Sequence, residues 1–428
     1  MKIKSLLFAA LAFVPSVLSA QVIEGDVLVR GDGVPKDYKI PEGIREIAPN
    51  AFATSSVRSI ECPASLEVIG QCAFFYATEL KSVTFAPNSK LKTIGEQAFS
   101  DCTNLETIEL PNSVDSIGVN AFVLCENLKK ITIPTGLRKL SRSTFMSCSN
   151  LMKVKFPETL KEIDETCFAN CVSLTSLTLT GVETIGERAF YNCKVLTNVK
   201  LNEGLKEIKD NAFQRCIAIE TLELPASIEK TGAKLFLQCP EFDGFTVVAG
   251  SKYMMADGGV LYSKDKTTLY ECPQTAKSDN FVVPAETKLI RSMAFFECQD
   301  IKAITLPKNL EKVGTGALSN NGMATFNFTT NDYLIYEDNA LYYRSQNGNG
   351  LYLMAIPCKG TKTEFLLQPK TSYIADYAFS YNNSMQKVSL PDPVIGIGPR
   401  AFYACHGLKD IYSYRKTAPT RRRSVWRC

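Results

Sequence analysis

The chain has few of the residues from which catalytic and metal centres are usually built. Its 428 residues include one His and one Trp. The single histidine, His406, provides too few nitrogen ligands for a zinc site and only one location for a Ser-His or Cys-His pair. No phosphate-binding glycine motif and no calcium-loop spacing occur. The sequence therefore predicts no metal, no cofactor and no enzyme. A carboxylate pair among its 44 acidic residues is the alternative.

The chain also lacks an apolar run long enough to span a membrane. Residues 6–18 form an apolar run, whereas a transmembrane helix needs about 20 residues. The run follows two lysines and precedes Ser19 and Ala20, which is typical of a signal peptide cleaved after one of these residues. We expect an exported protein that is extracellular, at the cell surface or periplasmic, and that has no transmembrane span.

The chain also lacks a large excess of positive or of negative residues. Of the 48 Lys and Arg residues, two precede the predicted cleavage site and six follow Tyr414, so 40 remain in the body of the chain against 44 Asp and Glu. A protein that binds nucleic acid usually carries a basic face. We therefore expect no nucleic-acid partner, and we interpret the basic end of the chain as a solvated tail.

One phrase, Phe-x-x-Cys-x-x-Leu-x-x-Ile, is repeated along most of the chain, as in NAFVLCENLKKITIP and STFMSCSNLMKVKFP. The steps between its copies are 22 to 25 residues, apart from two of 59 and 61 residues. A unit of this size cannot bury a core alone and is typical of a solenoid, in which each coil packs on its neighbours. The repeated residue is found at the following positions: Phe52, Phe74, Phe99, Phe122, Phe145, Phe168, Phe190, Phe213, Phe236, Phe295, Leu318, Phe379 and Phe402.

Each repeat combines two patterns. The segment LETIELP alternates buried and exposed positions and ends at a proline, which indicates a short strand that pairs in parallel with its copy in the next coil. The segment SIGVNAFVLCENL has an apolar spacing closer to that of a helix. We therefore predict an α/β repeat solenoid of about 13 coils of about 23 residues, with a short helical or 3₁₀ turn opposite each strand.

A cysteine follows the repeated Phe by three residues in nine coils. Ala77, Ser55, Asn321 and Asn382 replace it elsewhere, which favours a small buried side chain whose thiol faces the turn backbone. A disulfide ladder is the alternative, because coils lie about 4.8 Å apart and disulfides accept Cα separations of ~4.4 to 6.8 Å. A metal row is disfavoured, since one thiolate per coil forms no tetrahedral cage. We predict that most of these thiols are free and buried: Cys102, Cys125, Cys148, Cys171, Cys193, Cys216, Cys239, Cys298 and Cys405.

The pattern in CTNLETIELPNSVDSIGVNAFVLC resembles the BspA-like leucine-rich repeat of surface proteins from Bacteroidetes, treponemes and trichomonads. The resemblance covers residues 40–411. It implies a right-handed β-α superhelix, exposure at the cell surface, and adhesion to host matrix proteins or to other cells. It supplies no catalytic residues, because the shared positions are core positions.

The two longer steps contain inserts that resemble each other, in YMMADGGVLY at 253–262 and YLIYEDNALY at 333–342. Each continues through a polar turn into another apolar strand, which indicates a β-hairpin. The expected organisation is a signal peptide at 1–20, an N-terminal cap at 21–48, leucine-rich repeats at 49–239, a β-hairpin insert at 240–290, repeats at 291–325, a second β-hairpin insert at 326–374, repeats at 375–414 and a basic tail at 415–428.

The inserts carry three candidate partner contacts. Alternation turns Ile335 and Tyr342 inward, so Tyr336 and Tyr343 are expected to point outward, and Tyr262 of the first insert is the third candidate. Tyrosine offers a large amphipathic contact at low ordering cost. Packing of these rings on their own hairpin is the alternative.

A fourth candidate contact lies in the N-terminal cap. Arg30, Gly31 and Asp32 form the tripeptide that integrins recognise, although Gly-Asp is also common in turns. The outward strand positions, by contrast, are polar and Thr-rich, which is typical of a solvated face or of a broad protein-binding surface.

The first prediction of function is a secreted or cell-surface, non-enzymatic binding scaffold for a protein or glycan of a host matrix or cell surface. A structural or envelope-organising repeat protein without a specific ligand is the second. A carbohydrate-active enzyme is the third.

Overall fold

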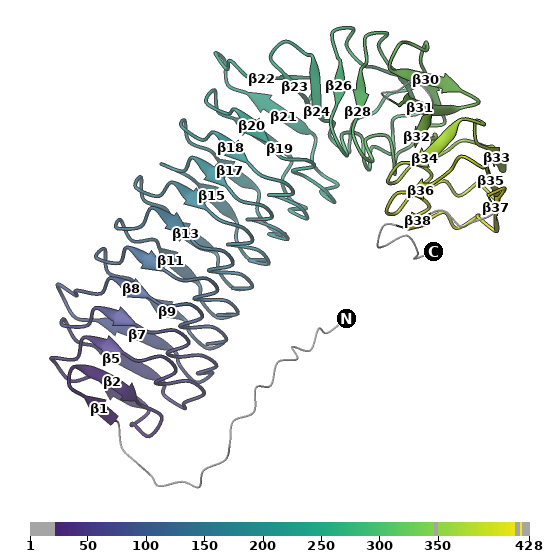
Figure 1. Cartoon of the computed structure of the whole chain (residues 1–428). Coiled ribbons are helices and arrows are strands. Elements are labelled where there is room, and N and C mark those ends of the chain that lie inside the picture. The colour runs from purple at the N-terminus through teal and green to yellow at the C-terminus, as the bar shows by residue number, and fades with distance from the viewer. Residues whose placement is uncertain (1–21, 346–349, 416–419, 422–428) are drawn as a thin grey trace.

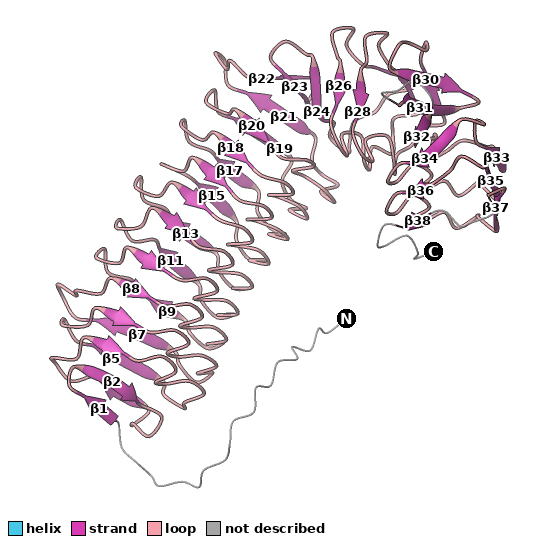
Figure 2. Cartoon of the chain, in the orientation of Figure 1, coloured by secondary structure: helices cyan, strands magenta, loops and turns pink. Residues whose placement is uncertain are grey.

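The computed structural model describes residues 22–345, 350–415 and 420–421. The predicted signal peptide and most of the predicted basic tail lie outside these ranges. Within them the chain forms short strands joined by turns, and none of the described residues is helical (Figure 2). The strands build a β-solenoid of about 17 turns, which has the shape of a hook (Figure 1).

The hook has three parts, which we name by their strands (Figure 1). The long arm runs from β1 (Val22–Glu24) to β21 (Gly244–Val247). The arch runs from β22 (Met254–Asp257) to β29 (Thr325–Asn327), and the short arm from β30 (Leu334–Glu337) to β38 (Thr420–Arg421).

Parallel strands stack along two sides of the solenoid. The first ladder holds the predicted LETIELP-type strands: β3 (Asp37–Lys39), β5 (Ser59–Cys62), β7 (Ser82–Phe85), β9 (Thr107–Ile108), β11 (Lys130–Thr132), β13 (Lys153–Lys155), β15 (Ser176–Thr178), β17 (Asn198–Lys200), β19 (Thr221–Leu224), β21, β25 (Phe281–Val282), β27 (Ala303–Thr305), β29, β33 (Glu364–Leu366), β35 (Lys387–Leu390) and β37 (Asp410–Ser413). The second ladder precedes the repeated Phe: β2 (Val27–Arg30), β4 (Glu46–Ile47), β6 (Val68–Ile69), β8 (Thr93–Ile94), β10 (Ser116–Ile117), β12 (Lys139–Leu140), β14 (Glu162–Ile163), β16 (Thr184–Ile185), β18 (Glu207–Ile208), β20 (Lys230–Thr231), β24 (Thr268–Glu271), β26 (Leu289–Ile290), β28 (Lys312–Val313), β32 (Leu351–Ala355), β34 (Thr371–Ile374), β36 (Gly396–Ile397) and β38.

The segment around the repeated Phe is an irregular turn, so the predicted helical or 3₁₀ turn is wrong. Asn120 and Leu124, on either side of Phe122, have φ angles of 58° and 60°. Such left-handed residues interrupt the hydrogen bonds of a helix. The N–H groups donate to the next coil instead, as Phe122 does to the Thr144 carbonyl at 2.9 Å. We call these segments the Phe turns.

A stack of phenylalanine rings forms the centre of the long arm. From Phe52 to Phe236 the successive ring centroids lie 4.8 to 5.5 Å apart, with planes within 11° of parallel. These rings are at most 1% exposed. The repeated Phe therefore builds one continuous core along the arm, as the period of the sequence predicted.

The cysteines of the Phe turns are buried, as predicted. In the long arm, from Cys102 to Cys239, each thiol donates to the carbonyl of the repeated Phe in the preceding coil at 3.1 to 3.3 Å. Burial raises the pKa of the Cys148 thiol. A neutral thiol is therefore a small donor that closes the turn, and Ala77 fills the same place without a bond.

The two inserts are more than hairpins, which corrects the predicted 13 coils. In the first insert, β22 pairs antiparallel with β23 (Val260–Ser263), β23 with β24, and β24 then joins β26 in parallel. In the second, β30, β31 (Ala340–Arg344), β32 and β34 repeat this order. The third strand of each insert thus completes a turn of the solenoid, and β2 and β38 complete two more.

The inserts also divide the core. Three apolar clusters follow one another along the chain, and they meet near 260 and 340, within the inserts. The solenoid changes direction at both places (Figure 1). We therefore call the two inserts the first and second joints of the hook.

Candidate functional site

A pocket of about 470 Å³ lies among Phe turns of the hook, and we call it the hook pocket. Phe turns from all three parts line it: Asn211, Gln214 and Gln238 from the long arm, Phe296 from the arch and Tyr381 from the short arm. Four other pockets among the described residues are each lined by at most one aromatic residue. The bends at the two joints bring these turns together.

The geometry of the Phe turn explains why these side chains face the pocket. Tyr377 and Tyr381 are the two left-handed residues on either side of Phe379, with φ angles of 62° each. Asn211 occupies the equivalent place before Phe213. The Phe ring fills the core, so its neighbours at the apex of the turn remain on the surface.

Aromatic rings form one wall of the hook pocket. Tyr381 packs edge-to-face on Phe296 and on Tyr403, with centroids 5.9 and 5.5 Å apart. Partial burial raises the pKa of Tyr381 to about 12, and the neighbouring Tyr403 makes a smaller contribution in the same direction. Tyr403 is 39% exposed and offers surface to a ligand. Arg400 lies over the Tyr377 ring, 5.7 Å from its centroid, and donates to its hydroxyl.

The carboxylates of the hook pocket accept hydrogen bonds from the backbone. Asp210 accepts from the N–H of Ala233 at 2.8 Å, and Glu297 accepts from the N–H of Gln238 at 3.0 Å. The first bond connects neighbouring coils, the second spans the first joint, and together they fix both carboxylates. Each acid therefore has a structural role in the wall, which favours binding over acid–base chemistry.

Two buried charged side chains support the wall at the first joint. Glu271 is 2% exposed and accepts hydrogen bonds from the N–H groups of Leu235 and Phe236 at 2.8 and 3.3 Å. Lys234, also 2% exposed, donates to the Cys272 carbonyl at 3.4 Å. Burial raises the pKa of Glu271, although Lys234 and the two N–H groups oppose this. The carboxylate thus replaces the backbone acceptors that a regular next coil provides.

The three tyrosines predicted as contacts pack against the core to different degrees. Tyr262 is 3% exposed, so this candidate is a core residue in the structure and presents no free ring to a partner. Tyr336 is half-buried, and its hydroxyl donates to Asn339 at 2.5 Å. Tyr343 is half-buried against the core of the arch. Tyr342 is fully buried, as alternation predicted.

The Arg30-Gly31-Asp32 tripeptide lies at the first turn of the solenoid. Arg30 and Asp32 form a bidentate ion pair with each other at 2.8 Å. Gly31 takes the place of the repeated Phe, and a Cβ there would lie 2.2 Å from the Phe52 ring. A glycine is therefore needed here because the Phe52 ring ends the stack directly against this position. The side chains of Arg30 and Asp32 are both partly exposed.

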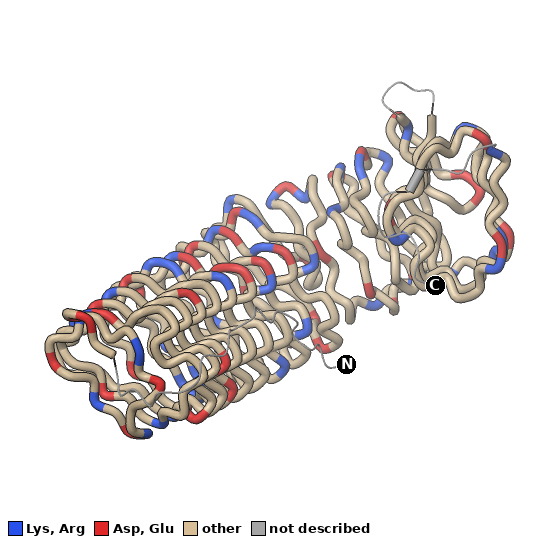
Figure 3. Tube along the Cα trace, turned by 60° about the horizontal axis from the view of Figure 1, so that its bottom comes forward, with Lys and Arg blue, Asp and Glu red and all other residues tan. Residues whose placement is uncertain are grey.

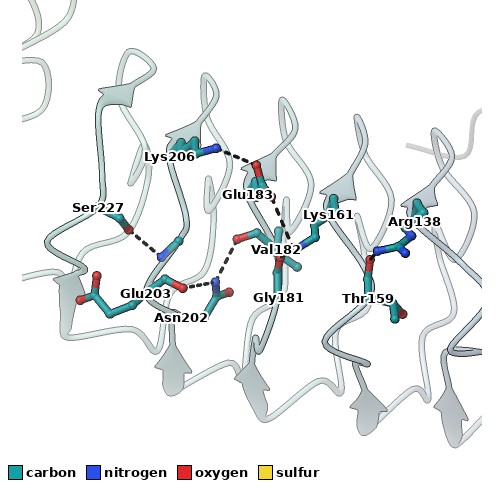
Figure 4. Close-up of polar contacts among 11 residues, drawn as sticks. Arg138, Thr159, Lys161, Gly181, Val182, Glu183, Asn202, Glu203, Lys206 and Ser227 are labelled. Carbon is teal, nitrogen blue, oxygen red and sulfur yellow. Dashed lines mark hydrogen bonds and ion pairs between the residues drawn. The ribbon is translucent and has the colours of Figure 1, made fainter.

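The remaining surface of the solenoid is polar and mixed in charge. Acidic and basic residues alternate along it (Figure 3). Glu183 pairs with Lys206 of the next coil at 2.8 Å and with Lys161 of the preceding coil at 3.5 Å, and Asn202 donates to the Val182 carbonyl at 3.1 Å (Figure 4). Exposed pairs of this kind contribute at most about 1 kcal/mol each. They give the long arm a solvated surface without a basic stripe.

One feature of the sequence, which the sequence analysis did not use, points to the hook pocket. Most Phe turns have a polar or small residue two positions after the Phe, but Tyr76 and Tyr381 place an aromatic ring there. Tyr76 is 53% exposed in a distant coil of the long arm. The sequence alone does not distinguish these two rings, because their difference arises from the bends.

Comparison with known proteins agrees with this fold. The profile of the BspA type leucine rich repeat region matches residues 45–175, 161–255, 267–349 and 358–421, in six copies. The chain therefore belongs to the BspA-type leucine-rich repeat family. None of the curated proteins matches it.

Two solved structures illustrate the likeness. A leucine-rich repeat protein from Bacteroides ovatus is 22% identical over 90% of this chain and 88% of its own, with a TM-score of 0.56. A leucine rich cell surface protein from Faecalibacterium prausnitzii is 21% identical over 92% of both chains, with a TM-score of 0.48. The first supports the solenoid fold.

Two features are absent from the described ranges. No helix there is long and apolar enough to cross a membrane. No group of three or more His, Cys, Asp or Glu in those ranges has the arrangement of a metal site.

Proposed function

We propose that the chain is an exported, non-enzymatic binding scaffold that contacts a macromolecule of a host matrix or of another cell's surface. The family supports a repeat scaffold, and the likeness to a cell surface protein supports its location. The observation that carries the proposal is the hook pocket, where three parts of the solenoid place aromatic and amide side chains around one hollow. Pockets of roughly 300 to 1,000 Å³ with a few convergent polar groups are typical ligand sites.

The test compares binding by the purified chain and its variants on immobilised matrix proteins and bacterial surface glycans. We expect the Tyr381→Ala/Tyr403→Ala variant to lose at least about tenfold in affinity, because buried aromatic contacts dominate binding energy. Tyr76→Ala is the matched control and is expected to bind normally. Equal binding by all three proteins would contradict a role for the pocket.

The second joint is the second candidate surface. Tyr336 and Tyr343 are half-buried and keep part of their rings accessible. If the Tyr336→Ser/Tyr343→Ser variant folds and loses binding while the pocket variant keeps it, the contact lies on this insert. If no probe binds, an envelope-organising role without a specific ligand becomes the better account.

A further inference from the structure

Several neutral hydrogen-bonding groups of the hook pocket have no partner among the described residues. The side-chain amides of Asn211, Gln214 and Gln238 line it, and none of them bonds to another side chain or backbone group of the described chain. The hydroxyls of Tyr381 and Tyr403 likewise form no hydrogen bond with a described residue. Each amide carries two N–H donors and one carbonyl acceptor, and each phenol both donates and accepts.

The charged groups of the same pocket already have partners within the protein. Arg188 pairs with Glu187 at 3.3 Å, and Arg400 donates to the Tyr377 hydroxyl. The two carboxylates that line the pocket each accept a backbone N–H, and Lys234 at its wall donates to the Cys272 carbonyl. A charged ligand would compete with these contacts, whereas an uncharged polar ligand would not.

The aromatic wall adds an apolar surface beside these neutral groups. Tyr403 is exposed, Tyr381 is half-buried, and the arrangement of the rings is fixed by edge-to-face packing on Phe296. A ring with an apolar body and a polar edge suits a ligand that also has both characters. A pyranose has this composition, because its C–H groups form an apolar face and its hydroxyl groups both donate and accept.

We propose that the hook pocket binds a short stretch of an uncharged glycan. The tyrosine rings of the short arm pack on the C–H face of a sugar, and the amides of the long arm exchange paired hydrogen bonds with neighbouring hydroxyl groups. The inference rests on the proposed binding function and specifies its ligand class. Acidic or sulfated glycans and peptide segments are the competing ligands.

The experiment is a glycan microarray that carries neutral, sialylated and sulfated oligosaccharides, probed with the full chain. We expect binding to neutral members. In titration calorimetry with the best neutral oligosaccharide, Gln214→Ala and Tyr381→Ala should each weaken binding at least about tenfold, and Tyr76→Ala should leave it unchanged. Tyr381→Phe keeps the ring and should retain part of the affinity. Because no ion pair forms, affinity should be constant between about 0.05 and about 0.5 M salt.

Three results would overturn the inference. Binding confined to charged glycans is the first, and neutral-glycan binding that the pocket variants do not change is the second. The third is pocket-dependent binding to a deglycosylated matrix protein with no glycan bound, which leaves the proposed function standing. If the full chain binds none of the probes, the inference and the proposed function both fail, whereas binding that the pocket variants leave unchanged removes only the pocket as the site. Melting temperatures within a few degrees of the wild type would show that each variant is folded.

Discussion

The two joints of the hook resemble each other in topology but differ in the chemistry of the interrupted coil. Cys272 and Ile356 occupy the same place, because their N–H groups donate to Ala294 and Ala378, each of which precedes a Phe. The residue before this place is Glu271 in the first joint and a buried alanine in the second. One joint therefore buries a carboxylate where the other buries a methyl group.

The two joints also differ in the Phe turn that packs against the interrupted coil. Lys234 precedes the turn that receives Glu271, whereas Gly316 precedes the equivalent turn before Ala355. The N–H of Leu235 donates to the Glu271 carboxylate, while that of Ala317 donates to the Gly314 carbonyl within its own turn. The same change of direction can thus be built with or without a buried lysine and a buried carboxylate, so these two side chains are not required by the hairpin topology.

The largest expected effect on stability comes from removing the buried carboxylate of Glu271 while Lys234 remains. Glu271→Ala leaves Lys234 buried without its anion and two N–H groups without an acceptor. We expect a loss of about 3–5 kcal/mol in the free energy of unfolding. Urea denaturation followed by circular dichroism measures this loss.

The double variant Lys234→Gly/Glu271→Ala gives the first joint the residues of the second. We expect it to be more stable than Glu271→Ala, because no charge remains buried and glycine readily adopts the φ of +47° found at this position. A single variant as stable as the wild type, or a double variant less stable than the single, would contradict our account of the joint.

A change in pH is expected to have a smaller effect on the stability of the fold. The pKa of Glu271 is raised in the folded chain, so the folded state holds this proton more tightly than the unfolded state. The contribution of this group to stability therefore falls as pH rises from the pKa of an exposed glutamate toward the raised value, by at most about 1.4 kcal/mol per pH unit. The slope should disappear in Glu271→Gln, and an identical pH profile in both proteins would disprove the assignment.

The long arm provides a contrast to the joints, because its repeated bonds are individually weak. Cys148→Ala removes one thiol donor and a small volume, as Ala77 does naturally, and should cost about 1 kcal/mol. Alkylation of the denatured, unreduced chain followed by mass spectrometry tests the same thiols. We expect label on more than half of the nine repeated cysteines. Label on fewer than half would favour the disulfide ladder.

The smallest effect is expected from removing metal. One His and a linear row of thiols provide no tetrahedral cage. Excess chelator should therefore leave the melting temperature of the chain unchanged, with no loss of stability in either joint or in the long arm. A clear decrease on addition of EDTA would show that an ion contributes to the fold.

The sequence predicted those parts of the fold that arise from contacts between one coil and the next. The Phe period gave the ring stack, and alternation placed Tyr342 in the core. The Phe turns were predicted as helical because residues such as Leu124 carry no sequence signal for a left-handed φ. The hook pocket was missed because it joins Gln214 and Tyr381, whose proximity depends on the bends at both joints.

The central claim is that the long arm and the short arm form one binding site. A double-mutant cycle with Gln214→Ala and Tyr381→Ala tests it, using titration calorimetry and the oligosaccharide or matrix protein that the wild type binds most tightly. Because one ligand spans both side chains, we expect the two losses to be coupled by more than about 0.5 kcal/mol. Losses that add independently, or a variant that binds as tightly as the wild type, would contradict a shared site.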